Sequence, residues 1–463
     1  MLRFLKYAFS LLSLTTLLYL CRVGKDHVAV DKSSLLAAGE GNPSALPEKV
    51  FRRGEIYAVR EIEVSPKERT KRPGLRMLSR LYAHRPSVEA DYPSTSPDLM
   101  PFIETLKRDM TVKGVTKYPW ALARKWSSSK SLIPESAPGL GDVLAAMATA
   151  PITAADICDD GTQVKILLKL QGYQKVLFKP KSYPRTAVIY GKNSGSDRHF
   201  GEIAAFNVGR LLGLQTLPAA VGRKVLLTEE VIPVSSRELA ETFYVNESSF
   251  ARFAVSENQT CLHARCPRCN PNRISCSDHN DAMEGAVIMW LPEHLRVSEK
   301  MYAWRHYYKR KELVEWEKDE HFCDAVLHND QGKLLLDLVD MSVLDFLIQN
   351  TDRHHYLQAT EDPSASVLLV DHGKSFANPD VDYMDILASL LQCCRLRAAT
   401  HARLVLLSGG GLSRALRELL RLDPLAPVLA DAHLRALDRR LAHVLAALSA
   451  CSEREGGWHN VLS

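Results

Sequence analysis

The chain has 463 residues, of which 46% are hydrophobic and 24% charged, so it can bury a large core in one large domain or in two lobes. Its formal net charge of +5 is mild and indicates acidic ligands only weakly. No block of Lys and Arg residues stands out, and we expect no nucleic-acid partner.

The N-terminus carries a secretory targeting segment. Arg3 and Lys6 precede an apolar run from about residue 7 to residue 21, and further basic residues follow it. A cleaved signal peptide ends in small residues, and the sequence YLCRVGK offers no such site. Residues 1–25 are therefore predicted to be a type II signal anchor. The short apolar run suits the thin membranes of the early secretory pathway, and the rest of the chain would be lumenal.

Residues 26–115 are rich in Pro, Ser, Lys, Arg and Glu, with the clearest breaks at AAGEGNPSALPEK and ADYPSTSPDLMP. This composition predicts a partly disordered lumenal stem with some helix near its end. Regular patterning begins near KYPWALARKW.

A β-hairpin is predicted over 162–181, where two aliphatic and β-branched runs are separated by QGYQ and the second run ends at Lys179. A polar loop follows, and then a helix with Ser196 as its candidate N-cap and Glu202 near its start. In kinases, a strand lysine is paired with a helix glutamate so that the lysine amine meets the α and β phosphates. Lys179 and Glu202 fit this pair, although two unrelated surface residues are the plainer interpretation.

The cysteines agree with a lumenal location. Four of the ten lie close together: Cys261, Cys266, Cys269 and Cys276. Their spacing would suit a zinc site as well as disulfides, but an oxidising lumen favours disulfides. The sequons that begin at Asn246 and Asn258 flank the same region, and they accept glycans only on a lumenal surface.

Two acids stand out in the C-terminal half. Asp352 lies in LIQNTDRHHYLQ, and Asp371 follows the apolar run VLLV and precedes HGKSF. The chain between them is long enough for a loop and a short hairpin that return both to one site, where they could serve as a base and a metal ligand for phosphoryl transfer. Alternatively, Asp352 ends a helix and pairs with Arg353. His354 and His355 are interpreted as loop-stabilising residues rather than metal ligands.

The chain from about residue 334 onward is mostly helical by its amphipathic period. The strands therefore come first and the helices afterwards, which predicts an α+β arrangement in two lobes. No Walker A motif or Gly-rich phosphate loop of the G-x-G-x-x-G type precedes Lys179, and neither H-R-D nor D-F-G is present.

Several motifs nevertheless resemble one family: GTQVK, VLFKPK, DRHFGEIAAF, EGAVIMWLP, DRHHY and LQCCRLR. They are similar, in kind, order and spacing, to those of the secretory-pathway kinases that include the Golgi casein kinase and the glycosaminoglycan xylosylkinase. The resemblance covers roughly residues 116–455. PGLGDVLAAMAT, FKPKSY and the Trp of MWLP are similar to the xylosylkinase branch.

The resemblance implies a two-lobed, atypical protein-kinase-like fold with a strand-rich N-lobe over 116–287 and a hinge and mainly helical C-lobe over 288–463. It implies ATP as cosubstrate, Mn²⁺ or Mg²⁺ as metal, and roles for the following residues: Gln163, Lys179 and Glu202 at the nucleotide, Ile288, Met289, Trp290 and Leu291 over the adenine, Asp352 as catalytic base, Asp371 at nucleotide and metal, and Asp197 at the metal. It also implies the disulfides Cys261–Cys276, Cys266–Cys269, Cys323–Cys393 and Cys394–Cys451, which leaves Cys21 and Cys158 outside these pairs.

One departure from the family concerns Leu357, which follows DRHHY where the family has a Glu that reaches the nucleotide site. Its loss could weaken cation binding. Because Asp352 and Asp371 are both present, we expect an active enzyme rather than a pseudokinase.

The resemblance therefore implies transfer of the ATP γ-phosphate to a xylose hydroxyl in the glycosaminoglycan–protein linkage region in the Golgi lumen. Alternatives are a secretory-pathway Ser protein kinase, a pseudokinase that supports an active relative, and a glycosyltransferase suggested by the D-x-D at 380–382. The expected partners are proteoglycan linkage oligosaccharides and, through the anchor, the Golgi membrane. A secreted form and a homodimer or a heterodimer with a related kinase are left open.

Overall fold

The computed structural model describes residues 81–114, 116–158, 161–245, 259–265, 269, 273–305, 313–329 and 332–463. The predicted signal anchor, most of the predicted stem and the asparagines of both sequons lie outside the described residues. Within the described part, no helix combines the length and the apolar character that a membrane span needs.

The strands are β1 (Ile152–Ile157), β2 (Ile166–Leu170), β3 (Gln174–Pro180), β4 (Ala220–Leu226), β5 (Phe243–Val245), β6 (Thr260–His263), β7 (Ile274–Cys276), β8 (Ala282–Met289), β9 (Val297–Met301), β10 (His355–Ala359) and β11 (Val367–Leu368). The α-helices are α4 (Leu81–Asp91), α5 (Leu99–Met110), α6 (Pro119–Trp126), α7 (Leu140–Thr149), α8 (His199–Leu212), α9 (Arg237–Ala240), α10 (Glu315–Lys318), α11 (Phe322–Asn329), α12 (Lys333–Ile348), α13 (Ala388–Cys393), α14 (Ala398–Leu406), α15 (Gly411–Leu420) and α16 (Asp431–Arg454). Short helical turns complete the set: η2 (Leu227–Val231), η3 (Ile232–Val234), η5 (Met384–Leu387) and η6 (Trp458–Asn460).

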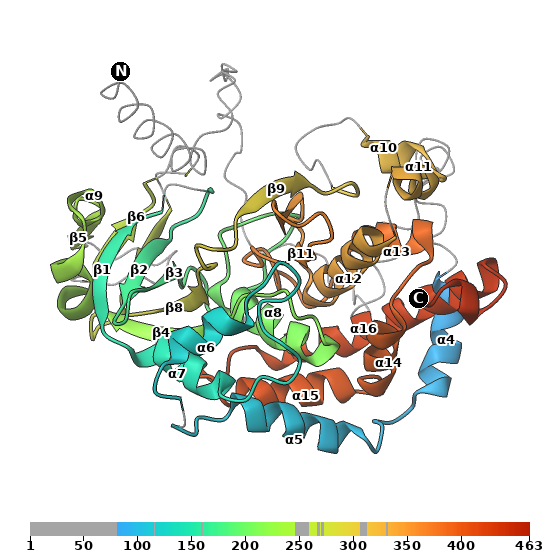
Figure 1. Cartoon of the computed structure of the whole chain (residues 1–463), viewed down its shortest axis with the longest axis horizontal. Coiled ribbons are helices and arrows are strands. Elements are labelled where there is room, and N and C mark those ends of the chain that lie inside the picture. The colour runs from blue at the N-terminus through green and yellow to red at the C-terminus, as the bar shows by residue number, and fades with distance from the viewer. Residues whose placement is uncertain are drawn as a thin grey trace, which may run out of the picture.

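One lobe is built on a five-stranded antiparallel sheet in the order β1-β2-β3-β8-β4, on the left of Figure 1. The predicted hairpin is confirmed, because β2 pairs with β3 along its whole length. The two strands are joined by a tight turn in which Gly172 and Tyr173 both have positive φ, at +86° and +65°. The hairpin is therefore the local structure that carries Lys179 to the end of a central strand.

Helix α8 connects this sheet to the second lobe, and all its residues are buried. It packs against β4 and β8 on one side and against α12 and α15 on the other. The predicted N-cap at Ser196 is wrong: the helix begins at His199, and the Ser196 N–H instead donates to Tyr183 Oη at 3.0 Å. Ser196 is held by a neighbouring loop and cannot cap the helix. Glu202 falls in the first turn, as predicted.

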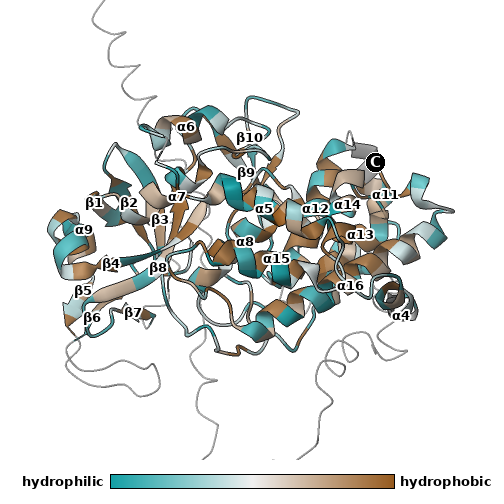
Figure 2. Ribbon diagram, turned by 90° about the horizontal axis from the view of Figure 1, so that it is seen from below, coloured by the Kyte–Doolittle hydropathy of each residue, from teal (hydrophilic) through white to brown (hydrophobic). Residues whose placement is uncertain are grey.

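The second lobe is mainly helical, with its hydrophobic residues gathered along α12, α13 and α16 (Figure 2). The long helix α16 buries one stripe of side chains: Leu434, Leu437, Leu441, Val444 and Leu448. The small sheet β11-β10-β9 lies between the lobes and carries the segment that separates the two candidate acids. The predicted two-lobed α+β fold is confirmed.

Two of the helices that precede the sheet in sequence pack on the helical lobe. Helix α4 lies against α16, and α5 lies against α15. Both fall inside the segment predicted as a stem, which we expected to hold some helix near its end. The α5 face that is buried consists of Leu99, Ile103, Leu106 and Met110, at helical spacing.

Disulfides tie several of these elements together. Cys261–Cys276 joins β6 to β7, Cys323–Cys393 joins α11 to α13, and Cys394–Cys451 joins the end of α13 to α16. These three predicted pairs are confirmed, so Cys261 and Cys276 are not zinc ligands. Cys269 is also disulfide-bonded, and its predicted partner Cys266 lies outside the described residues. The half-buried Cys158 forms none of these three bonds.

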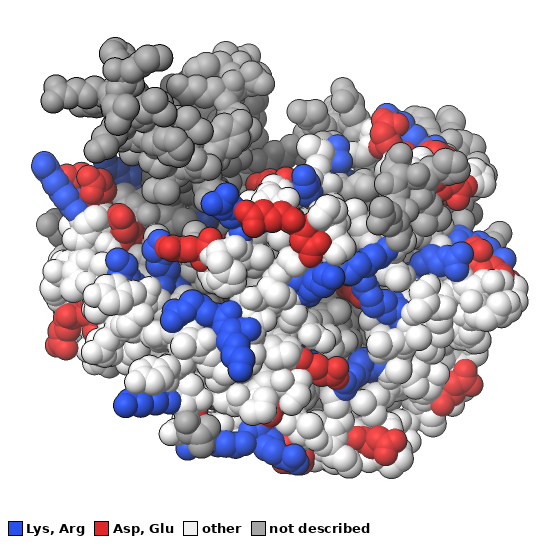
Figure 3. Space-filling view, in the orientation of Figure 1, with Lys and Arg blue, Asp and Glu red and all other residues white. Residues whose placement is uncertain are grey.

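On the face shown in Figure 3, acidic and basic side chains are interspersed among neutral residues. No single sign of charge covers that face.

Candidate active site

Lys179 is the centre of a cluster of charges between the lobes. It lies at the end of β3, beside Ala286 of the central strand β8, and is 5% exposed. Its Nζ contacts Glu202 Oε1 at 2.6 Å, Asp371 Oδ1 at 2.7 Å and Asp197 Oδ2 at 3.2 Å. The structure therefore brings together the strand lysine, the helix glutamate and two of the predicted metal-site acids.

The pKa values of these groups reflect their mutual stabilisation. Burial by itself lowers the pKa of Lys179, but the three carboxylates outweigh it and raise the pKa well above its usual value. Burial raises the pKa of Glu202, whereas Lys179 and His372 lower it, with a net result of about 2. The positive charge of Lys179 holds the pKa of Asp371 far below its ordinary value. Lys179, Glu202 and Asp371 are therefore charged at neutral pH.

Asp371 is the carboxylate that faces open space, with its side chain 55% exposed against 11% for Asp197 and 4% for Glu202. It follows β11 directly and adopts a left-handed conformation with φ +61°, which a non-glycine residue rarely does. Such conformations concentrate at functional sites because the surroundings must hold them in place. Here the contact with Lys179 provides that hold.

The segment after Asp371 passes close under helix α8. The Arg198 N–H donates to Gly373 O at 2.8 Å. A Cβ atom at position 373 would lie 2.3 Å from Asp197 Oδ2, and one at position 201 would lie 2.7 Å from His372 O. Gly373 and Gly201 therefore permit the approach that places Asp371 beside the first turn of α8.

Asp352 is carried to the same cleft by a buried ion pair. Arg353 binds Asp345 of α12 through two contacts, at 2.7 Å and 3.0 Å, and donates through Nη1 to Val370 O at 2.6 Å. The Arg353 side chain thus links the Asp352 loop to the residue directly before Asp371. The alternative interpretation of Asp352 as the partner of Arg353 is wrong, because that arginine is already bound to Asp345.

The environment of Asp352 suits a base at neutral pH. Partial burial raises its pKa to about 6, Asp371 and Asp197 act in the same direction, and His354 and Lys374 oppose them. Its side chain remains 30% exposed, so a bound molecule could reach it. A carboxylate with a pKa near neutrality can both take up and release a proton efficiently.

The two histidines after Arg353 act within the loop. His354 Nδ1 lies 2.6 Å from Asp352 O, and the rings of His354 and His355 meet edge to face at 4.2 Å. His355 also lies 3.3 Å from Glu299 of β9. These contacts agree with a loop-stabilising role.

Gln163 and residues 288–291 flank the cluster. Gln163 Oε1 accepts a hydrogen bond from the Asp197 N–H at 3.2 Å and another from Arg273. Ile288 and Met289 end strand β8, and the Trp290 N–H donates to Lys175 O at 3.2 Å. Trp290 is 39% exposed, while Leu291 packs partly against the core. The nucleotide roles of these residues remain predictions.

Several residues of the site escaped the sequence analysis. Lys374 is buried and donates to Gly195 O, and its positive charge lowers the pKa of Asp352. Arg273 bridges Gln163 and Gly195 O. Asn350 donates to Asp345 Oδ1 at 2.9 Å. Lys374 lies three residues after Asp371 and could have been suspected on that ground, but Arg273 and Asp345 carry no local signal.

The D-x-D at 380–382 does not form a metal site. Asp382 is 1% exposed and paired with Arg439 at 2.6 Å and with Arg440 at 2.8 Å. Its carboxylate is bound by two guanidinium groups of α16 and is not available to a metal ion. This arrangement removes the feature that suggested a glycosyltransferase.

Comparison with known proteins identifies the family. A family model described as "Golgi casein kinase, C-terminal, Fam20" matches residues 118–460. The chain belongs to the Fam20 family. It is 43% identical to the human glycosaminoglycan xylosylkinase over 73% of this chain and 81% of the relative.

Two solved Fam20 structures are similar to the whole described body. Hydra Fam20, solved with sugar, superposes with a TM-score of 0.69 at 39% identity and covers 75% of this chain and 99% of its own. The Golgi casein kinase with Mn/ADP bound gives a TM-score of 0.67 at 28% identity over 80% and 93% of the two chains. The resemblance inferred from the motifs and the kinase-like fold are confirmed.

Leu357, the departure from the Fam20 pattern, lies on β10. It pairs with Glu299 of β9 and with Leu368 of β11, and it packs partly against the core. His355 is two residues away on the same face of the strand, and its pKa is affected by the charge of Asp371. Leu357 and His355 therefore share one face of β10.

The charge balance of the cluster fits a divalent cation. Three carboxylates surround one ammonium group, so the buried charges leave a negative excess that includes the exposed Asp371. Carboxylate oxygens are the ligands that Mg²⁺ and Mn²⁺ prefer, and in kinases one or two carboxylates act together with the phosphates of the nucleotide. No group of three or more acidic, His or Cys residues in the described part is arranged to hold a metal alone.

Proposed function

We propose that this protein transfers the γ-phosphoryl group of ATP to a xylose hydroxyl in the glycosaminoglycan–protein linkage region. The observation that carries the proposal is the convergence of Lys179, Glu202, Asp197 and Asp371 in one cleft, with Asp352 electrostatically coupled to it. The choice of a sugar acceptor is supported by the 43% identity to a xylosylkinase and by the similarity to a Fam20 structure solved with sugar.

Each residue of the site has a separate role in the reaction. The acceptor hydroxyl oxygen forms a bond to the γ-phosphorus while the bond between that phosphorus and the ADP oxygen breaks, and the hydroxyl proton passes to Asp352. Lys179, held in place by Glu202, places its positive charge beside the phosphate site and positions the carboxylates around it. Catalysis then rests on positioning and on charge neutralisation, as in other phosphoryl transfers.

Mn²⁺, or Mg²⁺ in its place, would be held by Asp371 and Asp197 and would neutralise charge on the phosphates. Support for Mn²⁺ comes from the similarity to a Golgi casein kinase structure with Mn/ADP bound. Gln163 and residues 288–291 would contact the nucleotide and its adenine.

The cellular setting is part of the proposal. Residues 1–25 would anchor the protein in the Golgi membrane as a type II single-pass protein, with the kinase lobes at 116–287 and 288–463 in the lumen. The three disulfides suit an oxidising compartment. Glycans would be carried at Asn246 and Asn258. Release into the medium and dimerisation with itself or a related kinase are further possibilities to measure.

Two other functions share the same machinery. A secretory Ser protein kinase would differ only in the acceptor. A pseudokinase that supports an active relative is favoured by one observation, the apolar Leu357 on the strand face that also carries His355. The charged state of Lys179, Glu202 and Asp371 and the raised pKa of Asp352 argue for activity instead.

These functions are distinguished by which acceptor molecule receives the phosphate. The full chain is purified from a secretory host and incubated with γ-labelled ATP and Mn²⁺. A galactosyl-xylosyl acceptor and an acidic peptide that contains Ser are offered side by side. Asp352→Ala serves as the blank, and Asp371→Ala should lose metal-dependent ATP binding while it keeps the fold.

Label on the sugar alone, absent with Asp352→Ala, is the expected result. Label on the peptide would move the protein to the protein-kinase branch. If neither acceptor is labelled although Mn²⁺-ATP binds, the pseudokinase function replaces the proposal. Unchanged Mn²⁺-ATP affinity in Asp371→Ala would refute the role of that residue.

A further inference from the structure

Lys179 has no donor to spare for a phosphate group in this structure. Its ammonium group has three N–H donors. Each is directed at a carboxylate, in hydrogen bonds of 2.6, 2.7 and 3.2 Å to Glu202, Asp371 and Asp197. A nucleotide phosphate could be contacted by Lys179 only if one of these bonds were given up or shared. Binding of the polyphosphate without loss of these bonds therefore requires another positively charged side chain near Lys179.

The pairing of β2 with β3 places Lys165 next to Lys179. Leu167 pairs with Leu177, and Ile166 pairs with Phe178, in an antiparallel register. Lys165 directly precedes Ile166 and Lys179 directly follows Phe178, so the two lysines come next to each other just beyond the last pair of the ladder. Because successive pairs in a sheet alternate between its two faces, these two lysines share a face, and it is not the face of the buried Ile166 and Phe178.

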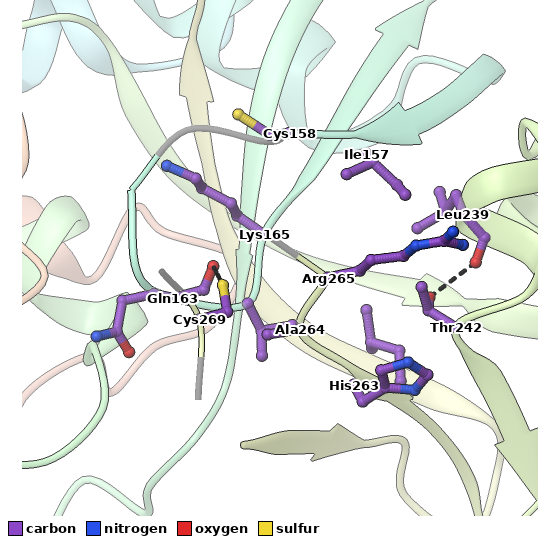
Figure 4. Close-up of a pocket in the computed structure, with 12 residues that line it drawn as sticks. Ile157, Cys158, Gln163, Lys165, Leu239, Thr242, His263, Ala264, Arg265 and Cys269 are labelled. Atoms are coloured by element: carbon purple, nitrogen blue, oxygen red, sulfur yellow. Dashed lines mark hydrogen bonds between the residues drawn. The ribbon is translucent and has the colours of Figure 1, made fainter. Parts of the chain in front are cut away.

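The end of the Lys165 side chain lies toward the charge cluster. Gln163, two residues before Lys165, accepts a hydrogen bond from the Asp197 N–H at 3.2 Å, so this segment borders the cluster. A Cβ atom at Gly161, where φ is +81°, would lie 2.8 Å from Lys165 Nζ, so the ammonium group rests over the loop before β2. Figure 4 shows the side chain extending away from Leu239 and Thr242, on the side where Cys158 lies.

Among the described residues, Lys165 differs from Lys179 in that no ion pair to its ammonium group is present. Among the residues that the structure describes, no carboxylate lies within ion-pair distance of its Nζ, although Asp371 is near enough to feel its charge. Its side chain is only partly buried. Two residues before it, Gln163 is already bound to the Asp197 N–H and to Arg273.

We infer that Lys165 is a second phosphate-binding lysine of the nucleotide site, and that it donates to the polyphosphate while Lys179 organises the three carboxylates. This inference rests on the proposed function, because it assumes that the cleft binds ATP. It assigns different tasks to two lysines on neighbouring strands. Lys165 provides free N–H donors, and Lys179 holds Asp371, Asp197 and Glu202 in place.

The test compares Lys165→Met with Lys169→Met in the full chain. Lys169 lies on the same strand and the same face but pairs with Lys175, farther from the cluster, and its Nζ lies over the ring of Tyr173. Mn²⁺-ATP and adenosine are titrated calorimetrically. Lys165→Met should weaken Mn²⁺-ATP binding about tenfold or more, because a hydrogen bond between charged groups is lost. Lys169→Met should bind like the unmodified protein.

Adenosine, which has no phosphate, should bind all three proteins equally. Lys165→Arg keeps the positive charge, and it shows whether substitution at this position by itself disturbs folding. This variant should retain most of the Mn²⁺-ATP affinity. Equal Mn²⁺-ATP affinity in Lys165→Met and the unmodified protein would overturn this inference alone. If Lys165→Met lost adenosine binding as strongly as ATP binding, its role would be structural and the inference would also fail. If the unmodified protein bound no ATP, the proposed function would fall and the inference with it.

Discussion

At the scale of single residues, the charges around Asp352 determine the pH at which it can act as a base. Its pKa of about 6 results from burial, reinforced by Asp371 and Asp197, against the opposing effect of His354 and Lys374. A base must be ionised to accept a proton, so its working fraction increases as the pH rises through its pKa. We therefore expect activity to rise between about pH 5 and pH 7.

Lys374→Met tests this electrostatic account. The positive charge of Lys374 lowers the pKa of Asp352, so its removal should raise that pKa and move the acid limb of the pH profile to higher pH. The measurement is kcat/KM against pH at saturating Mn²⁺. Lys300→Met is the control, because Lys300 is an exposed residue of β9. If the acid limb of the pH profile stays in place or moves to lower pH, Lys374 does not lower the pKa of Asp352.

At the scale of elements, the site depends on how β9, β10 and β11 are paired. The register places Leu357 opposite Glu299 and puts both on the face that also carries His355. An acid lost at one position of this face is therefore accompanied by an acid at the opposite position. Glu299 is 65% exposed, so its carboxylate is not committed to a buried contact.

Leu357→Glu returns an acid to β10. If the face is directed toward the metal, the variant should bind Mn²⁺ severalfold more tightly in the presence of ATP, because a hard oxygen ligand is added. The new carboxylate would stand opposite Glu299, at a cost of about 0.2–1 kcal/mol in unfolding free energy. The additional change Glu299→Gln should recover that cost.

The matched control is Gln358→Glu, which adds the same charge to the neighbouring residue on the opposite face of β10. Mn²⁺ is titrated into each protein at fixed ATP. Unchanged Mn²⁺ affinity in Leu357→Glu, or an equal gain in Gln358→Glu, would show that position 357 does not face the metal.

At the scale of the whole molecule, the helical lobe is held together by buried ion pairs between segments distant in sequence. Asp382 joins the segment before α13 to Arg439 and Arg440 of α16. Burial raises the pKa of Asp382, but the two arginines outweigh it and bring the pKa to about 2. Because the folded-state pKa is depressed, the stabilisation is present above the unfolded value near 4 and is lost as the pH falls through about 2.

Asp382→Asn should lower the free energy of unfolding at pH 7 by about 3–5 kcal/mol, because it leaves two buried guanidinium groups without their anion. Asp380→Asn, in the same D-x-D but exposed, should change stability by less than about 0.5 kcal/mol. Urea unfolding of the two variants provides the comparison. Equal stability of both variants would contradict the structural role of Asp382.

The local elements could be predicted from the sequence because their signals are local. The alternation in β2 and β3, the turn around Gly172 and the helical period after Asp197 each arise within a few residues. The motifs that carry the family resemblance likewise identified Lys179, Glu202, Asp352 and Asp371 as candidates. The Ser196 cap was wrong because the helix begins only at His199, after Arg198, whose N–H is held by Gly373 O of a segment distant in sequence.

The identities of the candidate residues, the order of the elements and the use of cysteines in disulfides were thus indicated by the sequence itself. Only the tertiary structure decided which groups meet: that Arg353 pairs with Asp345, that Asp382 is buried, and that Lys165 stands beside Lys179. The physical reason is that a pattern in sequence reports backbone preference and burial over a few residues. The partner of a charge depends instead on strand register and on the approach of segments far apart in the chain, which are settled only when the whole core is packed.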